Sequence, residues 1–159
     1  MSQTREEVIA YKRARFATRL PVARRYTLSH FWLREETSEV WRIGFAKFAA
    51  RMLGEMVEYE FSVRDGANVE TGQSIGWVEG FKAVSDLYCV ASGEFLGANP
   101  ALAQDITLID SDPYDKGWLY RVRGVPDLGS VDVHGYIAAL DATIDRMLQS
   151  RYYKGDSDA

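Results

Sequence analysis

Residues 78–88 of this 159-residue sequence run Val78-Glu79-Gly80-Phe81-Lys82-Ala83-Val84-Ser85-Asp86-Leu87-Tyr88 and contain the clearest structural pattern in the chain. Apolar residues on either side of a small-residue segment predict two short strands joined by a tight reversal. Lys82 lies in the middle of this reversal, with Glu79 three residues before it and Asp86 four residues after it. We therefore predict an exposed lysine on a rigid hairpin, flanked by carboxylates.

Two interpretations of Lys82 are open from the residues alone. A solvated turn lysine is the ordinary outcome for a charged residue between two strands. The other interpretation is a lysine that receives a covalent modification. Such a lysine must be exposed on a rigid hairpin, and its modifying enzyme needs nearby acidic residues to recognise, which Glu79 and Asp86 provide.

Outward from this hairpin, short apolar runs separated by turn residues predict further strands. The expected strands are residues 26–33, 40–44, 55–61 and 118–122, with a turn at 35–39. In the third of these, Val57, Tyr59 and Phe61 alternate with Glu58 and Glu60, as in a half-buried strand. Many short strands with regular turns predict a mainly β protein, a small barrel or sandwich with helices at its margins.

Three segments from residue 45 onward are predicted to be helical. Residues 45–53 lack turn formers and end at Gly54, which predicts a short helix with a glycine C-cap. A short helical piece is expected from Pro100 to about residue 108. Asp132 is a candidate N-cap for an amphipathic C-terminal helix, whose apolar stripe is expected to contain Ile137, Leu140, Ile144 and Leu148.

Charge is distributed unevenly along the chain. Residues 1–25 carry seven basic and two acidic residues, a net charge of +5, whereas the remainder carries twelve basic and twenty-one acidic residues, a net charge of −9. In the basic segment, Thr4 is a candidate N-cap, and two glutamates precede the Arg and Lys residues. This order of charges predicts a solvated helix that ends at about Phe16. The acidic body disfavours nucleic-acid binding.

Composition and motifs exclude several classes of protein. A hydrophobic content of 47% and a charged content of 26% are those of an average globular domain. No apolar run approaches the roughly 18 residues that span a bilayer, and no signal-peptide centre is present, so neither membrane insertion nor export is expected. One cysteine, Cys89, and two histidines, His30 and His134, provide no zinc-ligand spacing. Without a nucleophile elbow, P-loop or dinucleotide fingerprint, intrinsic catalysis has little support.

The hairpin closely resembles the lipoyl-lysine hairpin of the H protein of the glycine cleavage system, whose usual form is VESVKAASDLY. Further segments resemble the same family in order and spacing over about residues 26–123. They are Tyr26-Thr27 with Ser29-His30-Phe31-Trp32-Leu33 (family YT…HEWV), Gly44 with Leu53-Gly54-Glu55-Met56-Val57 (GIT…LGDVV), Ser92-Gly93-Glu94 with Asn99 and Leu102 (SGEV…N..L), and Leu108-Ile109-Asp110-Ser111-Asp112-Pro113-Tyr114 with Gly117-Trp118-Leu119 (LINSDPY..GWL).

This resemblance implies a lipoyl-type barrel-sandwich hybrid fold with lipoate joined by an amide bond to Lys82. We expect four parts: a basic helical extension at 1–25, the lipoyl domain at 26–128, a C-terminal helix packed on it at 129–150, and a polar tail at 151–159. The implied protein is a carrier without its own catalysis, because the reactive chemistry belongs to the cofactor.

The resemblance also implies a set of partners. A lipoate ligase or lipoyl transferase would modify Lys82, and the arm would visit glycine decarboxylase, aminomethyltransferase and dihydrolipoyl dehydrogenase. Tethering raises the effective concentration at each visit, and charge steers brief encounters. We expect a cytoplasmic monomer, or a mitochondrial one in a eukaryote, that binds neither nucleic acid nor membrane.

Departures from the family pattern concern the surroundings of the arm. Phe31 replaces the glutamate of the HEW motif, which in the family helps to hold the amine of the loaded arm, whereas Asp86 is retained. Lys47 and Phe45 replace an acidic residue and an isoleucine of the family. Residues expected to guide the modifying enzyme or to shelter the arm are Glu79, Phe81, Asp86, Phe31 and Met52.

Two alternatives stand beside a glycine cleavage H protein. One is an H-like lipoate-binding protein of heterodisulfide-reductase-like sulfur oxidation, carrying sulfur intermediates to that complex, which Phe31, Lys47 and the basic N-terminal segment favour. The other is an interaction module that is never lipoylated, which the intact set of Lys82, Glu79 and Asp86 disfavours.

Overall fold

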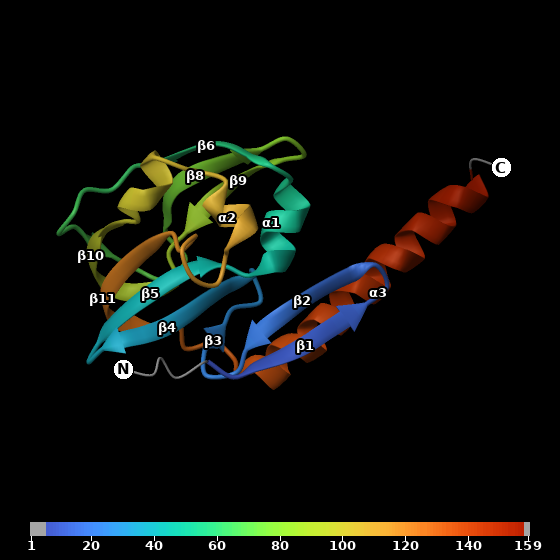
Figure 1. Ribbon diagram of the computed structural model, residues 1–159, viewed down its shortest axis with the longest axis horizontal. Coiled ribbons are helices and arrows are strands. Elements are labelled where there is room, and N and C mark those ends of the chain that lie inside the picture. The colour runs from blue at the N-terminus through green and yellow to red at the C-terminus, as the bar shows by residue number, and fades with distance from the viewer. Residues whose placement is uncertain (1–5, 158–159) are drawn as a thin grey trace.

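Two antiparallel sheets form the body of the protein (Figure 1). The structure, a computed structural model, describes residues 6–157, and for residues 151–157 it describes the backbone alone. The six-stranded sheet contains, in spatial order, β3 (Arg25–Tyr26), β4 (Phe31–Thr37), β5 (Val40–Phe45), β11 (Tyr120–Pro126), β10 (Ala91–Ala98) and β7 (Asn68–Val69). The three-stranded sheet contains β6 (Met56–Phe61), β8 (Ser74–Gly80) and β9 (Val84–Tyr88).

The principal core is built from apolar side chains of both sheets. Ile75 and Leu87 come from the smaller sheet, whereas Ile43 and Tyr120 come from the larger, and all four are fully buried. Burying one large apolar side chain contributes roughly 1.5–3 kcal/mol, so the two sheets stabilise each other. The mainly β architecture predicted from the turn spacing is confirmed.

Helices lie in the connections at one end of the sheets. α1 (Lys47–Leu53) follows β5 and ends at Gly54, whose φ of 80° makes the predicted glycine C-cap. The helical piece predicted from Pro100 to about 108 is two shorter elements, the 3₁₀ helix η1 (Pro100–Ala103) and α2 (Leu108–Ser111). α1 and α2 contact each other.

The predicted N-terminal helix is wrong over the residues that the structure describes. Residues 8–21 form an antiparallel hairpin of β1 (Val8–Arg13) and β2 (Phe16–Pro21), which packs along α3 (Val133–Ser157) (Figure 1). The charge order predicts a helix, but in the structure alternate residues of β1 face α3: the Tyr11 hydroxyl donates to Asp141 (2.7 Å), and Arg13 pairs with Asp145 (2.8 Å). These contacts across the fold outweigh local helix propensity. Thr4, the predicted N-cap, lies outside the described residues.

The C-terminal helix begins as predicted but continues further. The Asp132 carboxylate accepts a hydrogen bond from the backbone of Gly135 (2.8 Å), as an N-cap does, and the helix continues to Ser157, through the segment predicted as a polar tail from 151. Its buried stripe contains Val133, Tyr136, Leu140 and Ile144, whereas Leu148 is 45% exposed. α3 extends beyond the tip of the hairpin (Figure 1), which explains why the stripe ends before Leu148.

Two predicted strand features also differ from the structure. The strand expected at 26–33 is divided, because a turn that places His30 at a φ of 71° separates β3 from β4. β4 then continues to Thr37, so the turn expected at 35–39 shortens to its last two residues. In β6 a register shift between Met56 and Glu58 turns Val57 outward.

Candidate functional site

Lys82 is exposed in the turn between β8 and β9, as predicted. The backbone N–H of Gly80 donates to the carbonyl of Ala83 (2.9 Å) and closes the turn. The turn is also attached to the C-terminal end of α1: the N–H of Lys82 donates to the carbonyl of Leu53, the last residue of the helix (2.9 Å), and the N–H of Phe81 donates to the carbonyl of Glu55, two residues further on (3.0 Å). A hairpin tip held at three points presents its lysine from a fixed position.

Two glycines allow the hairpin to lie this close to α1. A Cβ on Gly80 would lie 2.1 Å from the carbonyl oxygen of Leu53, so the backbone contact needs a glycine there. A Cβ on Gly54 would lie 2.9 Å from Cγ of Lys82. The aliphatic stem of Lys82 therefore passes directly over Gly54, in space that any other residue would fill.

A cleft of about 540 Å³ lies between α1 and α2 at the foot of Lys82, and we call it the α1–α2 cleft. Its lining is Lys47, Ala50, Arg51, Gly54, Glu55, Lys82, Thr107, Asp110 and Ser111. Nζ of Lys47 donates to the carbonyl oxygen of Asp110 (2.6 Å), and Oδ2 of Asp110 accepts from the backbone of Met56 (3.1 Å). Burial raises the pKa of Asp110. The two helices are thus bound to each other across the cleft.

On the other side of α1 lies a smaller cavity of about 190 Å³, which we call the aromatic pocket. It brings together three of the predicted shelter residues, Phe31, Met52 and Asp86, with His30, Phe45 and Phe48 among the others. Phe31 is only 2% exposed and packs on Phe45, its cross-strand partner, with ring centroids 5.0 Å apart. Met52, at 45% exposure, lies at the rim. Lys82 is not part of the lining of this pocket.

His30 connects the aromatic pocket to α3. Its Nδ1 and the hydroxyl of Tyr136 are 2.8 Å apart, and its ring lies against Phe48 at 4.7 Å. Burial lowers the pKa of His30 to about 4. The sequence offered no sign of this role, because the partner is 106 residues away in the chain.

The stability of the fold should consequently fall as the pH decreases from about 6.5 to about 4. The folded protein holds His30 neutral, whereas the unfolded chain binds a proton there from about pH 6.5 downward, so protonation favours unfolding in this window. Asparagine tolerates the positive φ and does not titrate, so His30→Asn should flatten this part of a plot of urea midpoint against pH. His134→Asn, at an exposed histidine, is the control and should leave the slope unchanged.

The outer face of the smaller sheet is acidic. Glu79 faces Glu58 and Val84 across its neighbouring strands, and Asp86 faces Trp77, so both carboxylates lie on the same side of the sheet. Phe81, at the tip, is 76% exposed. All three remain candidates for contact with a modifying enzyme.

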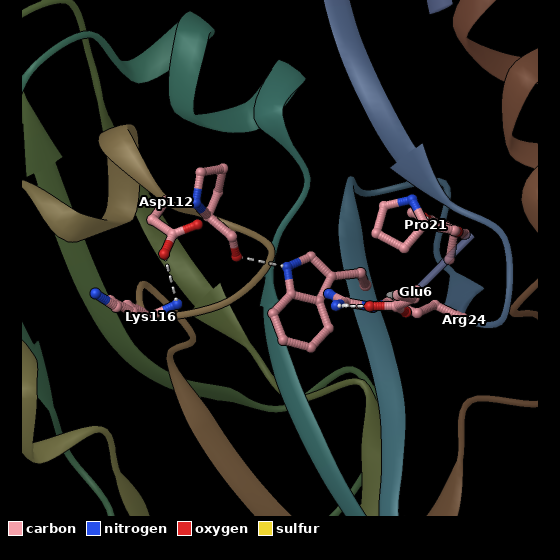
Figure 2. Close-up of polar contacts among 8 residues, drawn as sticks. Glu6, Pro21, Arg24, Asp112 and Lys116 are labelled. Atoms are coloured by element: carbon pink, nitrogen blue, oxygen red, sulfur yellow. Dashed lines mark hydrogen bonds and ion pairs between the residues drawn. The ribbon is translucent and has the colours of Figure 1, made fainter. Parts of the chain in front are cut away.

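Figure 2 shows the polar contacts that fix the segment after α2. Nε1 of Trp32 donates to the carbonyl of Pro113 (2.8 Å), and Asp112 accepts from the backbone of Lys116 (3.1 Å). On its other side, the Trp32 ring is covered by the guanidinium of Arg24 at 4.3 Å, which pairs with Glu6 (2.7 Å). This chain of contacts holds α2, one wall of the α1–α2 cleft, against the six-stranded sheet.

The sequence model of the family described as "Glycine cleavage H-protein" matches residues 24–131, more than half of the chain. The chain belongs to this family. Glycine cleavage system H proteins from Corynebacterium jeikeium (38% identical over 126 residues, 77% of this chain and 98% of that one) and Edwardsiella ictaluri (34% over 125 residues, 77% and 97%) are among its relatives.

A solved relative supports the same assignment. The crystal structure of a glycine cleavage system H protein from Mycobacterium marinum superposes with a TM-score of 0.68 at 32% identity, covering 75% of this chain and 97% of that one. The fold is therefore the lipoyl-type barrel-sandwich of the H proteins. Neither the sulfur-oxidation carrier nor the unmodified interaction module finds support among these relatives.

Hairpin β1–β2 and the whole of α3 lie outside the segment that the family model matches. Within residues 6–157, none of the helices has the length and hydropathy that crossing a bilayer requires.

Proposed function

We propose that this protein is a lipoyl carrier of the glycine cleavage system and that Nζ of Lys82 holds the lipoate. The observation that carries the proposal is the fixed, exposed position of Lys82, whose turn is bound to Leu53 and Glu55 through the backbone. The space above Gly54 that a Cβ would fill accommodates its stem. Membership of the H-protein family supports the choice of lipoate.

Attachment requires a modifying enzyme that supplies an activated lipoyl group. The neutral amine of Lys82 forms a C–N bond to the activated carboxyl carbon, the activating group leaves with the bonding electron pair, and one proton leaves the nitrogen. When bound, lipoate would supply a disulfide that is reduced as it takes up the aminomethyl group, and dihydrolipoyl dehydrogenase would reoxidise the resulting dithiol after the group has been passed on. The protein itself fixes the base of the arm and leaves its tip accessible.

The partners of the arm follow from this function. We infer that a lipoate ligase or lipoyl transferase recognises the acidic face around the hairpin, and that glycine decarboxylase, aminomethyltransferase and dihydrolipoyl dehydrogenase receive the arm in turn. The acidic outer face would steer these encounters more than it strengthens them.

Incubation of the unmodified protein with lipoate ligase, ATP and lipoate tests the proposal. We expect intact-mass measurement to show the addition of one lipoyl group, and the lipoylated protein to support glycine–bicarbonate exchange by the decarboxylase. A protein that remains unmodified beside a control H protein that is fully modified would contradict the proposal.

Neutralising Glu79 or Asp86 should slow ligation without weakening the fold. Both residues lie on the outer face of the smaller sheet, where substitutions usually change the free energy of unfolding by less than about 0.5 kcal/mol. Initial rates of lipoylation for Glu79→Gln and Asp86→Asn, compared with Glu35→Gln on the other sheet, measure the effect. Normal ligation with a large loss of stability would show that these carboxylates are structural.

A further inference from the structure

A groove of about 1200 Å³ is lined by residues of hairpin β1–β2, of β3 and of β4, and we call it the β4 groove. The hairpin supplies Val8, Arg19 and Pro21, which lie outside the segment that the family model matches. The β4 groove shares no lining residue with the α1–α2 cleft or with the aromatic pocket. It is therefore separate from the surroundings of Lys82.

The edge of β4 that faces the β4 groove is unpaired beyond Leu33. β3 pairs with β4 only at Trp32 and Leu33. The N–H of Thr27 donates to the carbonyl of Phe31 on this side of β4 (2.9 Å), and because the direction of bonding alternates along a strand, the backbone groups of Leu33 and Glu35 face the same side. β3 has ended before it reaches Glu35, so within residues 6–157 the N–H and C=O of Glu35 have no strand partner there. Such an edge can pair with another extended chain.

Three exposed arginines of the β4 groove carry charges that no carboxylate neutralises. Arg19, Arg25 and Arg34 form no ion pair with the described residues. The guanidinium of Arg25 donates to the hydroxyl of Ser130 (3.0 Å) and to the carbonyl of the same residue, which are both neutral groups. Its position is thus fixed while its charge stays available to an anion.

A carboxylate of the chain itself shows what this environment favours. Glu6 accepts two hydrogen bonds from the buried guanidinium of Arg24 (2.8 and 2.7 Å), which lies over the Trp32 ring (Figure 2). The hydrogen bond from Arg24, together with the charges of Arg24 and Arg34, lowers the pKa of Glu6 although burial opposes this. The arginines of the β4 groove therefore stabilise an ionised carboxylate placed among them.

The hairpin extends this basic surface. A second pocket of about 370 Å³ shares Arg19 with the β4 groove and is also lined by Lys12, with the small residues Ala10 and Ala17 between them. Ala10 faces Arg19 and Lys12 faces Ala17 across the two strands, and no carboxylate lines this pocket. By contrast, Arg13 on the other face of β1 is paired with two carboxylates of α3. The uncompensated charges of the hairpin thus lie on its outer face.

An extended acidic polypeptide matches both features of the β4 groove. Its main chain can bond to the N–H and C=O of Glu35, and alternate side chains of a strand lie on one face, where carboxylates would meet the arginines. Arginine binds carboxylates with paired hydrogen bonds. A nucleic acid fits less well, because the chain outside residues 1–25 has a net charge of −9 and repels a phosphate backbone.

We propose that the β4 groove binds an extended acidic segment of a partner protein, which adds to the edge of β4 at Glu35 and places its carboxylates against Arg19, Arg25 and Arg34. The inference goes beyond the proposed function and does not depend on lipoylation. A carrier held in this way would present its arm at a raised effective concentration to the protein that holds it. Because the β4 groove is separate from the cavities beside Lys82, docking there leaves the arm accessible.

Titration of the full-length, unmodified protein with a blocked hexapeptide of alternating glutamate and threonine tests the inference. We expect saturable binding that weakens as the salt concentration rises. Hydrogen exchange of the Glu35 amide should become slower in the complex, whereas that of Ile43, in an interior strand of the same sheet, should not change. A hexapeptide of alternating lysine and threonine should not bind.

Two double variants at exposed arginines provide a matched comparison. Arg19→Gln with Arg34→Gln should raise the Kd of the acidic peptide at least about tenfold, because it removes two charge-assisted contacts. Arg64→Gln with Arg146→Gln removes the same charge outside the β4 groove and should leave the Kd unchanged.

Three results would overturn the inference. They are equal affinities of the two double variants, a Glu35 amide whose exchange does not slow in the complex, and binding of tripolyphosphate as tight as that of the peptide, which would indicate a general anion surface. Lipoylation of Lys82 is measured separately by intact mass, so each of these results leaves the proposed function unaffected.

Discussion

Lys82→Arg should abolish lipoylation and carrier function completely while leaving the fold intact. Arginine keeps the positive charge, but its delocalised, permanently protonated guanidinium does not act as the neutral amine that forms an amide. The turn is held by backbone groups of Gly80, Phe81 and Lys82, and arginine keeps an aliphatic stem that can lie over Gly54 as the lysine stem does, so the fold should be unaffected. Intact mass after incubation with ligase, ATP and lipoate, together with a thermal unfolding curve, gives both readouts.

The matched control is Lys116→Arg, which makes the same change at another exposed lysine in a turn. The Lys116 contact to Asp112 uses its backbone N–H, so the side-chain change leaves that contact in place. We expect Lys116→Arg to accept one lipoyl group at the wild-type rate. Lipoylation of Lys82→Arg would show that another lysine carries the group.

A substitution at Phe31 should have a large effect on the stability of the fold. Phe31→Glu should lower the free energy of unfolding by about 3–5 kcal/mol, because it places an unpaired carboxylate in the core. Phe31 is 2% exposed, and its ring lies against Phe45 from the neighbouring strand. None of the residues lining the aromatic pocket is a lysine or an arginine that could pair with the new charge. Urea unfolding at pH 7 measures the loss.

Met52→Glu separates burial from charge. Met52 lines the same pocket at 45% exposure, so its carboxylate would stay in water, and we expect a change in the free energy of unfolding of less than about 0.5 kcal/mol. If Phe31→Glu were as stable as Met52→Glu, the Phe31 side chain would not be buried in the core as the structure places it.

The pair of Phe31 and Phe45 also shows what the sequence could not reveal. Each departs from the family pattern, and in the sequence they are two separate substitutions that enlarge the apolar surroundings of the arm. The structure pairs them directly across β4 and β5, so they are two halves of one contact. The register between β4 and β5 makes them partners. That register depends on the length of the turn between the two strands, which the sequence did not predict correctly.

The hairpin at Lys82 was predictable because all its determinants are local. Apolar strands, a small-residue reversal and flanking carboxylates lie within eleven residues, and the structure has the expected turn. The α1–α2 cleft was not predictable in the same way. Its walls come from residues 47–55 and 107–111, and Gly54, which the sequence marked only as a helix end, also makes room for the lysine stem.

In the N-terminal segment, the local charge pattern led to a wrong prediction. Its early glutamates and later basic residues are arranged as in a solvated helix, but Glu6 pairs with Arg24, and Arg13 pairs with Asp141 and Asp145 of α3. The charges that suggested an isolated helix are thus partners in contacts across the fold. Because α3 is more than 100 residues away in sequence, a local charge pattern could not indicate this arrangement.

Peptide mass spectrometry of the protein purified from its native host can show whether Lys82 carries lipoate. We predict that the peptide containing Lys82 carries the mass of one lipoyl group, with fragment ions that place it on Nζ of that residue. An unmodified Lys82 in protein from cells whose other lipoyl proteins are fully modified, or a lipoyl group on another lysine, would contradict the account.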